Sequence, residues 1–190
     1  MNAVGIIAMA AKPYHLAHDV MVRKAAADND VVELFVSLSD RRRTGEVTIR
    51  GSDMEVIWRE IIGPTLPANV RLTYGGSPVG NVWKHLGEAN LSGSRSTFNV
   101  YTGKKDLEEN WPEERLVRYV GDLFRSGQII LVTSDECYAA ITGTLMRALL
   151  AAGDRERFLA CLPGTLDRVR VWDILSSSAC YGEKQAPAGV

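Results

Sequence analysis

Cysteine is scarce in this chain of 190 residues, which contains only Cys137, Cys161 and Cys180. Their number is odd, and none belongs to a CxxC pair or has a histidine close by in the sequence. This pattern fits neither a disulfide framework nor a zinc cage. The sequence therefore favours the reducing environment of the cytoplasm.

Long apolar runs and an excess of charge are also missing. No uninterrupted apolar stretch approaches the roughly 18 to 20 residues that a membrane span requires. No basic residue precedes the short apolar run at the N-terminus, so a signal peptide is not expected. Lys and Arg total 22 against 23 Asp and Glu, and the net charge of −1 gives no broad attraction to nucleic acid or anionic lipid. These absences predict a soluble protein with no membrane partner and make nucleic acid a minority hypothesis.

What is present is the composition of an ordinary globular chain, 46% hydrophobic and 24% charged. A chain of this length suits one compact core and is too short for two. We expect one domain over residues 1–180 and a flexible tail over 181–190, which includes the ending QAPAGV.

Short apolar or β-branched segments alternate with helical ones along the chain. The expected strands are residues 4–9, 31–38, 69–74, 97–101 and 128–133. The expected helices are residues 15–28, 53–62, 82–86, 112–125, 142–150, 155–162 and 165–175, with Ser52 or Asp53 capping the second. Such alternation predicts an α/β fold, a three-layer sandwich with a five-stranded parallel sheet. Ligands of such sheets bind beyond the carboxyl ends of the strands.

The loop after the first expected strand carries two histidines. His15 and His18 are three positions apart at the start of a helix, which puts both rings on one face. A helix N-terminus offers free N–H groups and partial positive charge, so the pair could act with the backbone on a phosphate. Alternatively, one histidine caps the helix and the other is exposed. A zinc site is less favoured because His85 is the only other histidine. Lys12 could neutralise phosphate charge or be an exposed turn residue.

A second anion site is indicated after the last expected strand. Thr142, Gly143 and Thr144 precede a helix whose first turn holds Arg147. Hydroxyl and free N–H groups beside a guanidinium suit an anion. Thr144 could instead be a plain N-cap and Arg147 a solvated residue. Two such helix starts, each following a strand, are more specific than one.

The two segments, KPYHLAH and ITGTLMR, resemble the HxGH and ISGTxxR signatures of the nucleotidyltransferase superfamily, which includes the cytidylyltransferase-like proteins. The chain as a whole, including VVELFVSLSDRRRTGE and LPANV, is most similar to small nucleotidyltransferases of bacteriophage genomes. Ala17 replaces the motif glycine, as in ATP sulfurylases, and Thr142 replaces a serine but keeps the hydroxyl.

This resemblance implies a Rossmann-like enzyme that transfers a nucleoside monophosphate, AMP favoured over CMP, from a nucleoside triphosphate to a small phosphorylated acceptor, with release of pyrophosphate. It implies ATP or CTP as co-substrate, Mg²⁺ carried with the nucleotide, a homo-oligomer, and the host cytoplasm if the chain is phage-encoded. The implied catalytic residues are His15, His18, Lys12 and Arg147. The implied nucleotide-binding residues are Thr142, Gly143, Thr144, Ala10 and Ala11.

The run Arg41, Arg42 and Arg43 follows the second expected strand and could bind an acceptor phosphate or the nucleotide, or be a solvated face. The segment GKKD, at 103–106, is a further candidate for lining the nucleotide. A rival hypothesis is a catalytically silent nucleotide-binding sensor or assembly protein. A dehydrogenase and a P-loop kinase are disfavoured because GxGxxG and GxxxxGK[ST] are lacking.

Overall fold

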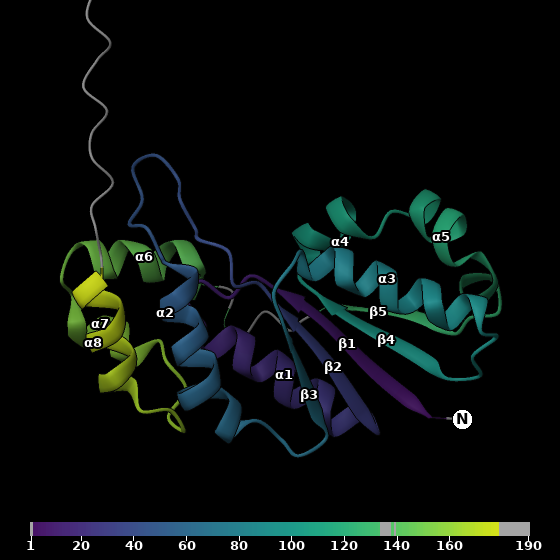
Figure 1. Cartoon of the computed structure of the whole chain (residues 1–190), viewed down its shortest axis with the longest axis horizontal. Coiled ribbons are helices and arrows are strands. Elements are labelled where there is room, and N and C mark those ends of the chain that lie inside the picture. Colours follow the sequence, from purple (N-terminus) through teal and green to yellow (C-terminus); the bar gives the residue numbers. More distant parts are fainter. Residues whose placement is uncertain (1, 134–137, 139, 179–190) are drawn as a thin grey trace, which may run out of the picture.

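The computed structural model describes residues 2–133, 138 and 140–178 of the chain. Its centre is a five-stranded sheet in the order β3-β2-β1-β4-β5, with every neighbouring pair parallel (Figure 1). The strands are β1 (Ala3–Met9), β2 (Val31–Val36), β3 (Val70–Tyr74), β4 (Thr97–Thr102) and β5 (Ile129–Thr133). The predicted parallel sheet and its five strands are confirmed.

Helices cover both faces of the sheet, which gives the expected three layers (Figure 1). One side carries α1 (Leu16–Asp28), α2 (Gly51–Val56), a π-helical turn η1 (Ile57–Ile62), a 3-10 turn η2 (Gly63–Thr65), α6 (Gly143–Ala151), α7 (Arg155–Ala160) and α8 (Arg168–Ser178). The other side carries α3 (Pro78–Leu91), α4 (Lys104–Asn110) and α5 (Glu113–Arg125). In the part of the chain that the structure describes, no helix is long and apolar enough to cross a membrane.

The near-continuous apolar run of β1 follows from this double covering. Successive residues of a strand point to opposite faces. Ile6 and Ile7 are neighbours in β1, and both are fully buried, Ile6 in the core beneath α3 and α5 and Ile7 in the core beneath α1 and η1. A strand covered on both sides has no polar face, as expected for a parallel sheet.

The strand order creates one crevice. From β1 the chain adds β2 and β3 on one side, and then crosses over to add β4 and β5 on the other. The loops after β1 and β4 therefore leave the sheet toward opposite layers. The gap between them, beyond the carboxyl ends of the two strands, is where ligands of such sheets bind.

The helix predicted over 53–62 begins earlier and is capped differently. It starts at Gly51, neither Ser52 nor Asp53 is its N-cap, and the Gly51 N–H donates 2.8 Å to Oδ1 of Asp40. A Cβ at Gly51 would lie only 1.6 Å from the main-chain oxygen of Leu38, so the chain passes there only because residue 51 has no side chain.

Two further helices differ from expectation. The helix predicted over 82–86 extends from Pro78 to Leu91, and the hydroxyl of Ser77 caps it by accepting from the Gly80 N–H at 3.2 Å. Helix α4 was not expected, because its sequence KKDLEEN has no apolar stripe. The tail predicted over 181–190 lies outside the described residues.

Candidate active site

A cavity of about 830 Å³ lies at the carboxyl ends of β1 and β4, a volume in the usual range for small-molecule sites. Most of the site residues predicted from the sequence line it: Ala10, Ala11, Lys12, His15, His18, Arg41, Thr142, Gly143, Thr144 and Arg147. The structure thus brings the first loop and the start of α6 together in one crevice. Arg42 and Arg43 are exposed and do not line this cavity.

The two histidines are stacked on each other inside the cavity wall. The ring centroids of His15 and His18 are 3.8 Å apart, with 23° between the ring planes. His15 is only 4% exposed, and although it is the N-cap of α1 its side chain makes no capping hydrogen bond. The alternative of one capping and one exposed histidine therefore does not describe this pair.

Both rings are held in the neutral form. Burial, and then the nearby guanidinium of Arg147, lower the pKa of His15 to about 4. Burial and the adjacent His15 lower the pKa of His18 well below its usual value. A neutral imidazole has one N–H donor and one acceptor nitrogen. Among the described residues, the buried Nδ1 atoms of both rings have no hydrogen-bond partner. Buried polar atoms without partners are costly, and a bound ligand would satisfy them.

A buried network fixes the start of α1. Tyr14, itself 2% exposed, stacks on His18 with centroids 5.7 Å apart. Its hydroxyl donates 3.2 Å to Oδ1 of Asp19, whose other oxygen accepts 2.8 Å from Nε of Arg23. These contacts leave His18 little freedom to turn away from the cavity.

Arg147 is also buried, with 5% exposure, and each of its three nitrogens is occupied. Nη1 donates 2.8 Å to the main-chain oxygen of Lys12, Nη2 donates 3.1 Å to Oγ1 of Thr144, and Nε donates 2.8 Å to Oε2 of Glu46. The N-cap of α6 is Thr142, whose Oγ1 accepts 3.1 Å from the Leu145 N–H. Thr144 is therefore not the N-cap, and Arg147 is not a solvated residue.

Lys12 is not an exposed turn lysine. It is 5% exposed, and its Nζ donates to the hydroxyls of Ser37 and Ser39 at 3.3 and 3.4 Å. Burial lowers the pKa of Lys12, while the carboxylate of Asp40 opposes this shift. Before it, Ala11 has a φ of +45°, a left-handed conformation that L residues rarely adopt. The loop after β1 thus follows a constrained path that places a buried lysine in the wall of the cavity.

The three residues of the arginine run lie in different surroundings. Arg41 lines the cavity, with its Nε 3.7 Å from Oε2 of Glu46. Arg42 pairs with Asp40 at the surface, 2.7 Å away. Glu46 was missed by sequence reasoning, although it is the one acid within the basic segment RRRTGE. That isolated acid is the only signal that could have drawn attention to it.

The other end of the cavity is formed by β4, α4 and the start of α3. Its lining includes Pro78, Val79, Tyr101, Thr102, Gly103, Lys104, Asp106, Asn110 and Trp111. Three residues of the candidate segment GKKD, namely Gly103, Lys104 and Asp106, therefore line the cavity. The ionised lining side chains are mostly cations, namely Lys12, Lys24, Arg41, Lys104 and Arg147, with Asp106 as the carboxylate among the described residues. The crevice suits an anion, despite the near-zero net charge of the chain.

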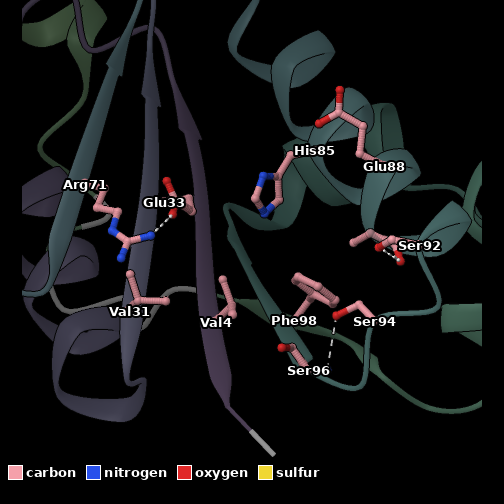
Figure 2. A pocket seen from close by; sticks show the side chains of 11 residues that line it. Val4, Val31, Glu33, Arg71, His85, Glu88, Ser92, Ser94, Ser96 and Phe98 are labelled. Carbon is pink, nitrogen blue, oxygen red and sulfur yellow. Dashed lines mark hydrogen bonds and ion pairs between the residues drawn. The ribbon is translucent and has the colours of Figure 1, made fainter.

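A second hollow of about 460 Å³ lies near the opposite ends of the strands, between the sheet and α3 (Figure 2). Its floor is apolar, with Val4 and Phe98, and its rim carries the 3.4 Å ion pair of Arg71 with Glu33 and the ring of His85 (Figure 2). None of the residues predicted to be catalytic or to bind the nucleotide lines it, nor does the arginine run 41–43.

Comparison with known proteins supports the fold. No protein-family model and no curated protein sequence matches the chain. A protein of Vibrio parahaemolyticus assigned as a nicotinate-nucleotide adenylyltransferase superposes with a TM-score of 0.56 at 14% identity, covering 92% of this chain and 99% of that one. TmcAL of Thermotoga maritima, bound with alpha-thio ATP, gives a TM-score of 0.51 at 14% identity, covering 93% of this chain and 56% of that one. At this identity the likeness establishes a shared Rossmann-like α/β fold, as predicted.

Proposed function

We propose that this protein is a nucleotidyltransferase, which transfers a nucleoside monophosphate from a nucleoside triphosphate to a small phosphorylated acceptor and releases pyrophosphate. The observation that carries the proposal is the meeting of His15 and His18, with their unsatisfied buried nitrogens, and of Arg147 in one cationic crevice. The structural neighbours support it, since one is assigned as an adenylyltransferase and the other binds an ATP analogue. That analogue favours AMP over CMP as the transferred group.

In this reaction an acceptor oxygen attacks the α-phosphorus while the bond from the α-phosphorus to the bridging oxygen of pyrophosphate breaks. Pyrophosphate leaves with the electron pair, and no covalent enzyme intermediate forms. The protein's task is to align two anions and to stabilise the charge that develops between them. Donors that are fixed before the substrate arrives are suited to this task, because they need not reorganise during the reaction.

The loop after β1 and helix α6 would each bind a different part of the triphosphate. His15 and His18 would donate to oxygens of the α- and β-phosphates, and Lys12 would offset charge from beneath. Arg147 would hold the β- and γ-phosphates together with the hydroxyl of Thr144. This division is supported by their common lining of the crevice and by the burial of Arg147 and Lys12.

Mg²⁺ would reach the site on the triphosphate and would neutralise part of its charge. Within the described residues, no three His, Cys, Asp or Glu side chains are grouped as metal ligands. Phosphate oxygens and water would therefore supply most ligands, as is common for Mg²⁺. The cationic lining fits this arrangement because it can bind the phosphate oxygens that the ion leaves free.

The acceptor would occupy the end of the crevice formed by β4 and α4, where Tyr101, Lys104 and Trp111 contribute. Of the arginine run, Arg41 lines the cavity and is the residue that we assign to phosphate contact. A phosphorylated nucleoside, a pantetheine phosphate and a sugar phosphate are the acceptors to test.

The experiment has two stages. Thermal unfolding with ATP, CTP, GTP or UTP and Mg²⁺ identifies the donor, because a ligand that binds the folded state raises the melting temperature. Pyrophosphate release is then measured across the acceptor panel. His15→Ala and His18→Ala should each lower turnover by about a hundred- to a thousandfold. His85→Ala is the matched control, because His85 lies in the other hollow.

Turnover at the parent rate in both cavity variants would overturn the proposal. Nucleotide binding without pyrophosphate release from any acceptor would favour a nucleotide-binding sensor or assembly protein instead.

A further inference from the structure

The segment after β2 forms a closed loop beside α6. Arg41 and Ile49 pair as an antiparallel bridge, with N···O distances of 2.8 and 3.1 Å, and the Glu46 N–H donates 3.1 Å to the oxygen of Arg43. Gly45 takes a φ of +78° at the turn. Val47 and Ile49 are buried in the core beneath α1 and η1. The main chain on both sides of Glu46 is therefore anchored.

From this loop, Glu46 reaches a residue 101 positions further along the chain. Its Oε2 accepts 2.8 Å from Nε of Arg147 and lies 3.7 Å from Nε of Arg41. The arginines lower the pKa of Glu46, so it is ionised at neutral pH. A hydrogen bond between ionised groups is short and roughly twice as strong as a neutral one.

The contact completes a three-point attachment of the Arg147 guanidinium. The other two points are the main-chain oxygen of Lys12 and Oγ1 of Thr144. A guanidinium is planar and has five N–H donors, three of which are used here, so one remains on each terminal nitrogen. Three acceptors from three segments fix both the position and the plane of the group.

We propose that Glu46 is a positioning residue that acts through Arg147, holding the guanidinium so that its two remaining N–H groups meet the pyrophosphate part of the substrate. This inference rests on the proposed function, since it deepens the assignment of Arg147. Without Glu46, the guanidinium would lose one of its three attachments, and Arg41 and Arg147 would face each other with no carboxylate between them. A long side chain that must be ordered on binding costs affinity, and prior ordering avoids that cost.

A Glu46 that competes with phosphate for Arg147 would change the pyrophosphate affinity in the opposite direction. If Glu46 merely occupied Arg147 in the place of a phosphate, its removal would free a donor and tighten anion binding. The sign of the change in affinity therefore separates a positioning residue from a competing anion.

The probe is inorganic pyrophosphate with Mg²⁺, titrated calorimetrically into the full-length protein. Glu46→Ala should weaken binding by about ten- to a hundredfold, the range expected for the loss of one hydrogen bond to a charged group. Glu46→Gln keeps an oxygen for Nε and should recover most of that loss. The control is Thr44→Ala, an exposed change on the same loop, which should bind as the parent does.

A double variant tests whether Glu46 acts through Arg147. In the Arg147→Met background, Glu46→Ala should cause no further loss, since coupled residues are not additive. Additive losses, or unchanged or tighter binding in Glu46→Ala, would overturn the inference. If Arg147→Met does not fold, the comparison of Glu46→Ala with Glu46→Gln decides alone.

Pyrophosphate binding separates this inference from the proposed function. A parent protein that binds pyrophosphate but transfers no nucleotide would contradict the proposed function and leave the Glu46 comparison fully measurable. A parent protein that binds no pyrophosphate would overturn the role of Glu46.

Discussion

Nη1 of Arg147 donates a 2.8 Å hydrogen bond to the main-chain oxygen of Lys12, although the two residues are 135 positions apart. The bond joins the loop after β1 to the N-terminal half of α6, the two segments on which the proposed phosphate site depends. Through this contact the fold joins the two halves of the site.

Gly143→Ala tests this junction. A Cβ there would lie 3.0 Å from Nη1 of Arg147 and 3.5 Å from the Lys12 oxygen, so the guanidinium would have to shift. The free energy of unfolding should change little, because alanine is the better helix former by up to about 1 kcal/mol and this gain offsets the cost of moving the guanidinium. The dissociation constant for the nucleotide should rise by about tenfold, the effect of weakening one hydrogen bond between Arg147 and a phosphate.

Gly164→Ala is the matched control. Its Cβ would also lie 3.0 Å from an arginine nitrogen, that of Arg168, but Gly164 does not line the cavity. Calorimetric titration of both variants with the preferred nucleotide checks the prediction. Parent affinity in Gly143→Ala would show that the junction does not position Arg147.

The neutral histidines predict a loss of stability in mild acid. The unfolded chain protonates His15 near its ordinary pKa of 6.5, whereas the folded chain does so only near about 4. Between these values the unfolded state binds more protons, so the free energy of unfolding falls as the pH falls. The loss from His15 is at most roughly 3 kcal/mol, and His18 adds to it with the same sign.

Urea unfolding of the parent and of His15→Gln at pH 7 and pH 5 checks this dependence. The glutamine variant keeps an N–H donor but cannot titrate, so its stability should fall less between the two pH values. If the parent and His15→Gln lost the same free energy of unfolding between pH 7 and pH 5, His15 would not be held neutral by the fold.

Binding of a polyphosphate should oppose the lowering of the His15 pKa. An anion beside the two rings favours their charged forms, which raises the pKa of His15 in the complex. The parent should therefore take up protons on binding, and its affinity should rise from pH 7 to pH 5 more steeply than that of His15→Gln. Calorimetry in buffers of different ionisation enthalpy measures the protons directly. Identical proton uptake in both proteins would place the phosphates away from His15.

The sequence was informative where the signal is local. The apolar runs predicted all five strands, and the spacing of His15 and His18 placed them together at the start of α1. Contacts between distant segments have no such signal. Glu46 meets Arg147 only because the loop after β2 folds back over α6, and Arg41 lines the cavity while Arg42 turns to Asp40 at the surface.

The start of α2 is another feature that spacing could not reveal. Its first N–H is satisfied by Asp40, eleven positions earlier, and its position depends on the missing side chain of Gly51. The sequence offered Ser52 and Asp53, which are ordinary capping residues, and the predicted boundary followed them.

Gly51→Ala should therefore be strongly destabilising. The added Cβ would meet the Leu38 oxygen at 1.6 Å, which the chain can avoid only by moving α2 or the segment that follows β2. We expect a loss of about 3 kcal/mol or more in the free energy of unfolding, in the range of severe overpacking. Gly87→Ala, inside α3 with nothing within 4 Å of the added Cβ, should instead be neutral or stabilising by up to about 1 kcal/mol. Similar stabilities for both variants would contradict the close approach at Gly51.

The proposed transfer of a nucleoside monophosphate is tested most directly by following the phosphorus atoms of the nucleotide into the products. The preferred nucleoside triphosphate is supplied in two forms, radiolabelled at the α- or the γ-phosphorus, with Mg²⁺ and the acceptor panel. We expect the α-label to appear in the acceptor product and the γ-label in pyrophosphate, with both appearances slowed by about a hundredfold or more in His15→Ala. Transfer of the γ-label to an acceptor, or release of the γ-label as orthophosphate with no α-label transferred, would contradict nucleotidyl transfer at this site.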